Sequence, residues 1–163
     1  MRRLILMRHA KSDWGAGLED HERPLNKRGK ASAAALGGWL RRHAIVPDCV
    51  LCSSAERTGQ TLFGLRLPEA VPMTFTKNLY LAEPEEMLTL LRRCEQACVL
   101  MIGHNPGIGE MAARLMDDPP EHTRFFDYPT GATLIVDFSV DSWNDIGWHK
   151  GQPIEFTVPR DLA

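Results

Sequence analysis

The stretch LILMRHA, residues 4–10, decides the fold because it joins an uninterrupted apolar run to a charged residue and a histidine. An apolar run with no polar residue inside it is typical of a strand that is buried on both faces of a parallel sheet. Residues 11–26, which follow, are polar and contain Gly and Pro, and residues 27–43 then place apolar side chains at helical spacing. The sequence therefore predicts a strand, a loop and a helix in that order.

The same order of elements recurs further along the chain. Residues 48–52 form a second short apolar run, and residues 55–65 follow with helical spacing and with Ser53 or Ser54 as the expected N-cap. The further expected elements are an extended segment at 72–80, a helix at 83–94, a strand at 97–102, a helix at 106–116 and strands at 131–138 and 153–158.

Strands that alternate with helices predict a three-layer α/β/α fold with a mostly parallel central sheet. A chain of 163 residues suits one core, and no linker or internal repeat divides it, so we expect a single domain spanning residues 1–163. The C-terminal quarter, from about Phe125, carries no chemical motif. We expect it to complete the sheet or to shape access to a site.

Composition excludes several classes of protein. Hydrophobic residues make up 44% of the chain and charged residues 25%, which is ordinary for a globular protein. The formal net charge of −2 provides no long-range attraction to nucleic acid or to anionic membranes, so neither is an expected partner. The apolar run near the N-terminus is far shorter than the core of a signal peptide, and we expect a cytoplasmic location.

The four cysteines admit a zinc interpretation, because Cys49 and Cys52 form a C-x2-C pair and Cys94 and Cys98 a C-x3-C pair. Strand alternation, however, would direct Cys49 and Cys52 to opposite faces of the sheet. Reduced and mostly buried thiols are the better interpretation. The sequence predicts no metal ion.

Polar residues follow three of the expected strands at the point where each strand ends. Arg8 and His9 follow the first strand, Arg57 lies just after the second, and His104 follows a later one. Ligands of open α/β sheets bind outside the carboxyl ends of the strands, so these side chains are expected to converge. Two arginines and two histidines suit a tetrahedral dianion, because the arginine fork matches phosphate oxygens. The sequence predicts a phosphate site.

Three segments together resemble the motifs of the histidine phosphatase (phosphoglycerate mutase-like) superfamily. LMRHAKSDW resembles its RHG or RHA signature, SSAERTGQT its S-x-x-x-R-x-x-Q-T segment, and MIGHNPGI its second histidine motif. The small size, RHAKS in place of RHGES, ERPLNKRG and GHNPG are similar to the SixA-type phosphohistidine phosphatase branch. The phosphoglycerate mutase branch carries Gly where Ala10 stands, so mutase activity is not the expected one.

The resemblance implies a role for each site residue. His9 would be the nucleophile that is transiently phosphorylated, Arg8, Arg57 and His104 would bind the phosphoryl group, and Arg23 would assist. No metal or cofactor is implied. For His9 to attack as the neutral form, its other ring nitrogen should donate to a backbone carbonyl. His104 would act as a donor and, if protonated, would add positive charge.

Two assignments have open alternatives. Glu83 is the tentative general acid for an alkoxide leaving group, but it could equally cap a helix, and Asp13 is a weaker candidate that would more readily stabilise its loop. Arg23 could instead be a loop charge paired with Asp20 or Glu22.

The cationic group on the first expected helix, Lys27, Arg28 and Lys30, also has two interpretations. It would form the solvated face of the helix, or it would dock an acidic phosphoprotein.

The predicted function is removal of phosphate from phosphohistidine on a partner protein, without a metal ion. Few residues separate the motifs, which leaves little room for a large lid, and an open site suits a protein substrate. The alternatives are a broad small-molecule phosphomonoesterase, for which Glu83 would be a working acid, and a non-catalytic module that binds phosphoproteins. Retention of both His9 and His104 speaks against the second alternative.

Overall fold

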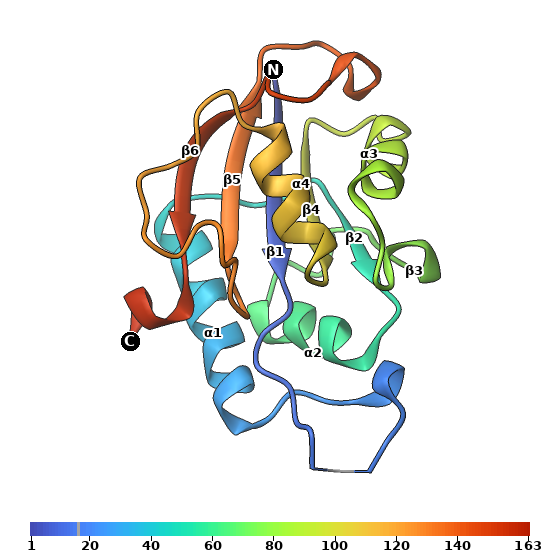
Figure 1. The fold of residues 1–163 in the computed structure, drawn as a ribbon, viewed down its shortest axis with the longest axis vertical. Coiled ribbons are helices and arrows are strands. Elements are labelled where there is room, and N and C mark those ends of the chain that lie inside the picture. The colour runs from blue at the N-terminus through green and yellow to red at the C-terminus, as the bar shows by residue number, and fades with distance from the viewer. Residues whose placement is uncertain (16) are drawn as a thin grey trace.

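A computed structural model describes residues 1–15 and 17–163, and its centre is a six-stranded sheet (Figure 1). The spatial order of the strands is β3-β2-β4-β1-β5-β6, so the strand that precedes His9 lies inside the sheet. The strands are β1 (Arg2–Arg8), β2 (Cys49–Ser53), β3 (Met73–Thr76), β4 (Cys98–Gly103), β5 (Thr133–Phe138) and β6 (Gln152–Thr157).

β3, β2, β4 and β1 run parallel to one another, whereas β5 and β6 each pair antiparallel with a neighbouring strand. β1 pairs with β4, and β2 pairs with both β4 and β3, all in parallel. β5 pairs antiparallel with β1, and β6 pairs antiparallel with β5. The predicted three-layer α/β fold with a mostly parallel sheet is confirmed, and the C-terminal quarter completes that sheet.

Two helices cover each face of the sheet (Figure 1). The helices are α1 (Lys27–Arg42), α2 (Glu56–Leu65), α3 (Pro84–Arg92) and α4 (Gly107–Leu115). One apolar cluster joins the sheet to α3 and α4, and a second cluster joins the other face of the sheet to α1 and α2. The core is therefore split into two halves by the sheet, as the apolar strand pattern requires.

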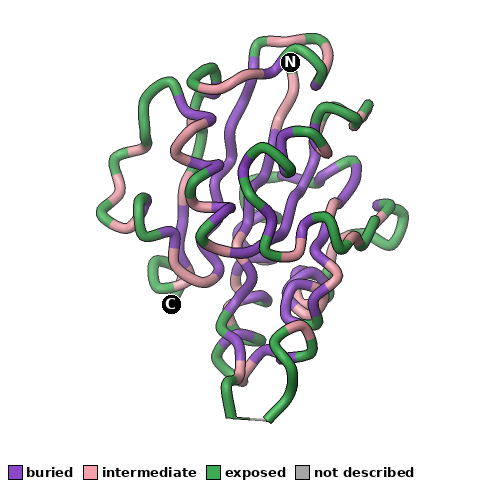
Figure 2. The backbone as a smooth tube through the Cα atoms, turned by 45° about the vertical axis from the view of Figure 1, so that its right-hand side comes forward, coloured by how far each residue is buried: buried purple, intermediate pink, exposed green. Residues whose placement is uncertain are grey.

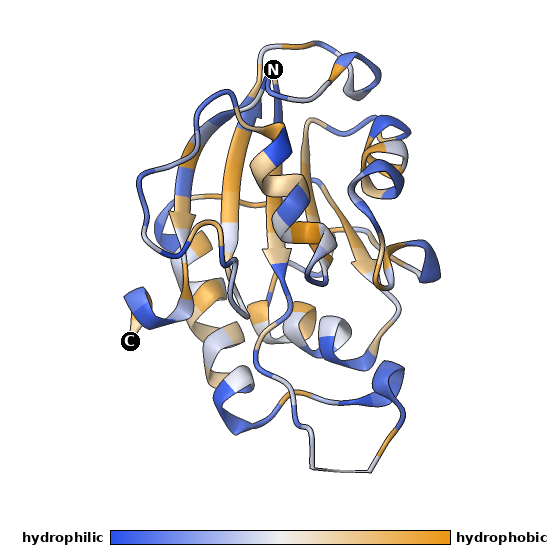
Figure 3. Cartoon of the chain, viewed as in Figure 1, coloured by the Kyte–Doolittle hydropathy of each residue, from blue (hydrophilic) through white to orange (hydrophobic). Residues whose placement is uncertain are grey.

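Strand alternation distributes the apolar runs between these two clusters. In β1, Leu4 and Leu6 belong to the cluster under α3 and α4, whereas Ile5 and Met7 belong to the cluster under α1 and α2. All four side chains are fully buried, and Figure 2 shows the buried strands beside the exposed loop that follows β1. Figure 3 shows the same strands as the most hydrophobic part of the chain.

The cysteines follow the same rule. Cys49 lies in one cluster and Cys52 in the other, so the C-x2-C pair is divided between the two faces of the sheet, as predicted. All four cysteines are free thiols.

The helix starts agree with the sequence in part. Asn26 caps α1, because its side-chain oxygen accepts from the backbone N–H of Gly29 at 2.8 Å. The prediction that Ser53 or Ser54 caps α2 is wrong, since the N-cap is Ala55. Ser53 still belongs to β2, and its hydroxyl lies against a histidine of the site described below.

The loop between β1 and α1 has structure of its own. It contains a 3-10 turn, η1 (Asp20–Glu22), and an antiparallel bridge between Ser12 and Leu25 closes its base. In the described part of the chain, no helix has the length and apolar character needed to span a bilayer.

Candidate active site

His9 lies directly after β1, at the carboxyl end of this inner strand, and its side chain is buried. Its Nδ1 lies 2.7 Å from the carbonyl oxygen of Ala10. Because a carbonyl oxygen only accepts hydrogen bonds, Nδ1 carries the proton and Nε2 keeps its lone pair. The contact confirms the predicted hydrogen bond to a backbone carbonyl.

The surroundings of His9 keep its ring neutral. Burial lowers the pKa of His9 to about 4, because an imidazolium loses its hydration there, and the charges of Arg8 and Arg57 act in the same direction. The hydrogen bond to Ala10 raises the pKa but is outweighed. At neutral pH, Nε2 of His9 is therefore an unprotonated nitrogen with the character of a nucleophile.

His104 follows β4, and its ring centroid lies 5.3 Å from that of His9. Nη2 of Arg57 donates to Nδ1 of His104 at 3.3 Å. Nε2 of His104 lies 2.7 Å from the hydroxyl oxygen of Ser53. Since Nδ1 accepts, Nε2 carries the proton and donates to Ser53. Ser53 is thus a positioning residue that the sequence analysis assigned to a helix cap.

The charge of His104 differs from the cationic form that the sequence analysis considered. Burial first, and then the neighbouring His9 and Arg57, lower the pKa of His104 to about 3. The ring is therefore a neutral hydrogen-bond donor at neutral pH. A bound phosphoryl dianion would act in the opposite direction, because an anion nearby favours the charged imidazolium.

Arg8 and Arg57 bring two guanidinium groups to the same pocket. Arg57, in the first turn of α2, is only 2% exposed, and Arg8 at the end of β1 is half-buried. The Nε–H group of each is buried and has no hydrogen-bond partner among the described residues. Buried donors without partners are costly, so oxygens of a bound phosphoryl group would satisfy them.

Asp20, in η1, is a functional residue that the sequence analysis treated only as a pairing partner. Its carboxylate accepts hydrogen bonds from Arg57 at 3.0 Å, from Arg23 at 3.1 Å and from the hydroxyl of Tyr80. The Tyr80 hydrogen bond first, and then the two arginines, hold the pKa of Asp20 well below its usual range. Asp20 is thus an internal anion that balances the arginines before substrate binds.

Arg23 belongs to the pocket and also to its loop. It is 7% exposed and pairs with Asp20, as the alternative interpretation expected. Its Nη1 donates to the Ser12 hydroxyl at 2.7 Å, and Trp14 stacks on its guanidinium at 3.5 Å. These contacts hold Arg23 at the wall of the pocket, where it lines the same space as His9. Both interpretations of Arg23 are therefore consistent with the structure.

These side chains surround one pocket of about 400 Å³ at the carboxyl ends of β1, β2 and β4. Its lining residues are Arg8, His9, Lys11, Ser12, Trp14, Asp20, Arg23, Arg57, Leu81, His104, Asn105 and Thr130. Arg8, His9, Arg23, Arg57 and His104 are brought together as the sequence analysis expected.

Glu83 and Asp13 lie outside this lining. Glu83 is exposed and is the N-cap residue of α3, with its backbone N–H donating to the Glu86 carboxylate at 3.2 Å. The helix-cap alternative for Glu83 is confirmed, and the acid role stays a prediction. The Asp13 carboxylate accepts from the backbone N–H of Gly15 at 2.8 Å, which is the expected loop-stabilising role.

The C-terminal quarter supplies part of the site, which no sequence motif indicated. The carbonyl oxygen of Tyr128 accepts from Arg8 at 3.1 Å and from the Asn105 side chain at 3.0 Å. The buried Tyr128 hydroxyl donates to the carbonyl of Leu6 in β1 at 2.5 Å. Thr130 lines the pocket itself. The segment before β5 therefore fixes Arg8, and only its long-range contacts reveal this role.

Residues 1–15 and 17–163 contain no group of three or more His, Cys, Asp or Glu side chains arranged to hold a metal ion. The positive charge of the pocket comes from Arg8, Arg23 and Arg57 and from Lys11.

Comparisons with known proteins give the class of the chain. Residues 4–80 match the model of the histidine phosphatase superfamily, branch 1. An uncharacterized protein of Mycobacterium tuberculosis (strain H37Rv) is 32% identical over 161 residues, which cover 94% of this chain and all of that protein. The chain belongs to the histidine phosphatase superfamily and is a phosphatase of that class.

Solved structures give the more particular likeness. The protein assigned as phosphohistidine phosphatase SixA from Nakamurella multipartitia is 28% identical with a TM-score of 0.85, and the match covers 97% of this chain and 96% of that one. Its counterpart from Agrobacterium tumefaciens is 26% identical with a TM-score of 0.78, over 97% and 98% of the two chains. The protein histidine phosphatase SixA complexed with tungstate shares the fold, with a TM-score of 0.79 over 99% of each chain at 24% identity.

Proposed function

We propose that the chain removes the phosphoryl group from phosphohistidine on a partner protein, through a phosphohistidine intermediate on His9 and without a metal ion. The observation that carries the proposal is the contact of His9 Nδ1 with the Ala10 carbonyl, which leaves Nε2 free among the arginines. The likeness to SixA structures supports the choice of substrate.

In the first step, the lone pair of His9 Nε2 attacks phosphorus and forms a new P–N bond. The P–N bond of the substrate breaks, and its electron pair leaves with the substrate imidazole, which takes a proton from solvent. The Nδ1–H of His9 stays hydrogen-bonded to the Ala10 carbonyl, which stabilises the positive charge that the phosphorylated ring acquires. Arg8 and Arg57 stabilise the charge on the phosphoryl oxygens.

In the second step, a water oxygen attacks phosphorus and the P–N bond to His9 breaks. The electron pair returns to Nε2, the water proton leaves to solvent or to the phosphate, and neutral His9 is restored. His104 donates through Nε2–H, and it exchanges its Ser53 contact for a phosphoryl oxygen when substrate occupies the pocket.

The choice of phosphohistidine over a phosphate ester follows from the leaving group. Among the described residues that line the pocket, Asp20 is the only carboxyl group, and its lowered pKa keeps it ionised at neutral pH. An ionised carboxylate has no proton to give to a departing alkoxide. Imidazole is a far better leaving group and does not need that acid.

The test measures phosphate release from a protein chemically phosphorylated on histidine and from p-nitrophenyl phosphate, in the presence of EDTA. We expect the native enzyme to prefer the phosphohistidine protein and His9→Ala to lose at least about 10³-fold in rate on both substrates. Circular dichroism of His9→Ala controls for folding.

Other outcomes would overturn the proposal. A preference for the aryl ester would identify a broad phosphomonoesterase instead, and loss of activity in EDTA would remove the metal-independent mechanism. Absence of His9-dependent release from either substrate would favour a module that only binds phosphoproteins.

A further inference from the structure

A second hollow adjoins the active-site pocket and shares two of its residues. Lys11 and Thr130 line both the pocket around His9 and a neighbouring hollow of about 170 Å³. The neighbouring hollow is bounded further by α1 and by the segments before β5 and after β6, which contribute Arg28, Ser32, Arg124, Pro129, Val158, Pro159 and Arg160. The space that begins at His9 therefore continues along α1.

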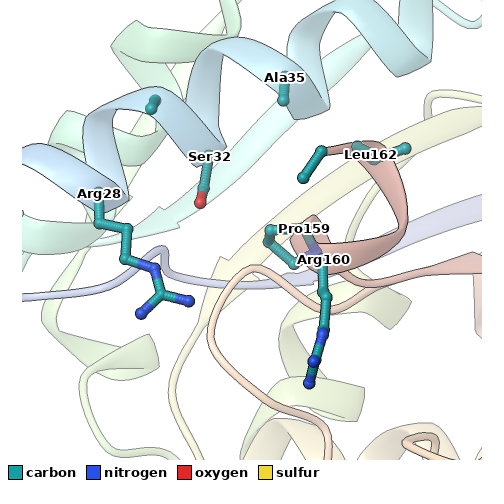
Figure 4. Close-up of a pocket in the computed structure, with 8 residues that line it drawn as sticks. Arg28, Ser32, Ala35, Pro159, Arg160 and Leu162 are labelled. Atoms are coloured by element: carbon teal, nitrogen blue, oxygen red, sulfur yellow. The ribbon is translucent and has the colours of Figure 1, made fainter.

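A third hollow, of about 300 Å³, extends the same path (Figure 4). Arg28, Ser32, Pro159 and Arg160 line both the second and the third hollow. Figure 4 shows Arg28 on α1 and Arg160 on the C-terminal turn at the two sides of this space, with Ala35 and Leu162 toward its other end. We call the second and third hollows together the basic groove.

The charged side chains that line the basic groove are all cationic. Lys11, Arg28 and Arg160 are exposed, and no ion pair joins them to any described residue. Arg124 is the exception, because Asp127 pairs with it at 2.9 Å. No Asp or Glu side chain lines either hollow in the described part of the chain. A chain with a net charge of −2 thus gathers unpaired cations beside its active site.

The length of the groove exceeds what a small phosphorylated molecule would contact. Arg28 and Ala35 are seven residues apart on α1, which places them about 10 Å from each other along the helix axis. That distance corresponds to about three residues of an extended chain. A ligand with its phosphoryl group at His9 must therefore continue for several residues beyond the pocket to fill the groove.

We propose that the basic groove binds an acidic segment of the phosphoprotein substrate, next to its phosphohistidine. This inference rests on the proposed function, because it names the sequence around the same phosphoryl group. Carboxylates of the segment pair with Lys11, Arg28 and Arg160, and apolar side chains pack at Ala35 and Leu162 at the far end. Of the cationic residues at the start of α1, only Arg28 lines the groove, so it is the one that takes part in docking.

The test compares two synthetic peptides that each carry one phosphohistidine, flanked by glutamates in the first and by glutamines in the second. We expect the native enzyme to prefer the glutamate peptide by about tenfold in kcat/KM, because three exposed ion pairs contribute modestly and additively. The preference should fall when the salt concentration rises from about 0.05 to about 0.5 M, since exposed charges are screened.

Two matched variants locate the effect. Arg28→Glu combined with Arg160→Glu should abolish the preference for the glutamate peptide. Lys27→Glu combined with Lys30→Glu reverses the same number of charges, on exposed residues that line neither hollow, and this control variant should keep the preference. Both variants should hydrolyse p-nitrophenyl phosphate at the native rate. A native enzyme without the preference, or equal loss in both variants, would overturn the proposal.

A binding measurement separates this inference from the proposed function. Fluorescence anisotropy of the labelled, unphosphorylated glutamate peptide does not require turnover. If the enzyme hydrolyses neither phosphohistidine peptide but binds the glutamate peptide through Arg28 and Arg160, the proposed function fails and the docking surface stands. If it hydrolyses both peptides equally and does not bind the unphosphorylated one, the docking surface fails and the proposed function stands.

Discussion

The active-site pocket and the basic groove both carry several cations, but they hold them in opposite ways. Arg57 and Arg23 are 2% and 7% exposed, and the carboxylate of Asp20 binds both of them. Arg28 and Arg160 are exposed and unpaired within the described residues. Buried charges that are already oriented stabilise a transition state without reorganisation, whereas exposed charges act on encounter and are screened by salt. We therefore expect the buried arginines to act in the reaction and the exposed ones to act in recognition of the substrate.

The largest loss of activity should follow the replacement of a buried arginine. Arg57→Ala removes a donor whose Nε–H is buried and unpartnered, and we expect kcat/KM to fall by about 10² to 10³ on every substrate, including p-nitrophenyl phosphate. Arg57→Lys, which keeps the charge but not the fork, should recover only part of the activity. A loss confined to the protein substrate would contradict the comparison, because it would make Arg57 a recognition residue.

The pH profile tests the neutral state of His9. Attack needs the unprotonated ring, and the pKa of His9 is lowered to about 4, so activity is lost as pH falls through that value rather than through the ordinary 6.5. We expect kcat/KM to stay level between about pH 5 and 8 and to fall about tenfold per unit below about pH 4, after correction for substrate ionisation. An acid limb near 6.5 would show that the pocket does not shift His9.

Replacement of Asp20 should have a smaller effect, and it should strengthen phosphate binding rather than weaken it. Its carboxylate shares Arg57 and Arg23 with any bound phosphate, and the two anions repel each other. Asp20→Asn should therefore tighten inhibition by inorganic phosphate about three- to tenfold. Asp161→Asn, an exposed carboxylate paired with His122 outside the pocket, is the matched control. Weaker inhibition by phosphate would mean that Asp20 acts mainly by holding the arginines in place.

The smallest effect is expected at Glu83. Because it caps α3 and lies outside the pocket lining, Glu83→Gln should change hydrolysis of phosphohistidine by less than about twofold. Glu86→Gln, at the other position of the same capping box, controls for the stability of the helix. A loss of tenfold or more on an alkyl phosphate ester alone would identify Glu83 as a working acid, because only an alkoxide leaving group needs the proton.

The parts of the fold that the sequence predicted are those that depend on local patterns. β1, β2 and β4 each contain an apolar run with no polar residue, at 4–7, 49–52 and 98–102, and a site residue follows each run within a few positions. Because parallel strands bring their carboxyl ends to one edge, these patterns alone placed His9, Arg57 and His104 together. The antiparallel direction of the strands in the C-terminal quarter could not be predicted, because an apolar run has the same pattern in a parallel and an antiparallel strand.

The parts that the sequence did not predict depend on contacts between distant segments. Ser53 has the residue type of a helix cap, and only the fold places His104 against its hydroxyl. Asp20 lies in a polar loop, where a carboxylate is common and gives no signal of a site. Only the fold brings it to Arg57, which is 37 residues away in the sequence. Tyr128 contacts Arg8 through its backbone carbonyl, for which no residue type gives a signal.

The pairing of β5 with β1 has a consequence for synthesis of the protein. Phe138 pairs with Arg2 and Thr133 with Met7, so the strand that leads to His9 receives its neighbour from residues far along the chain. The three motifs leave the ribosome well before that neighbour does. Until then β1 has an open, apolar edge, which is the kind of edge that pairs with other chains. A nascent or truncated chain that ends before residue 133 would contain all three motifs, yet His9 would stand at the edge of an unfinished sheet.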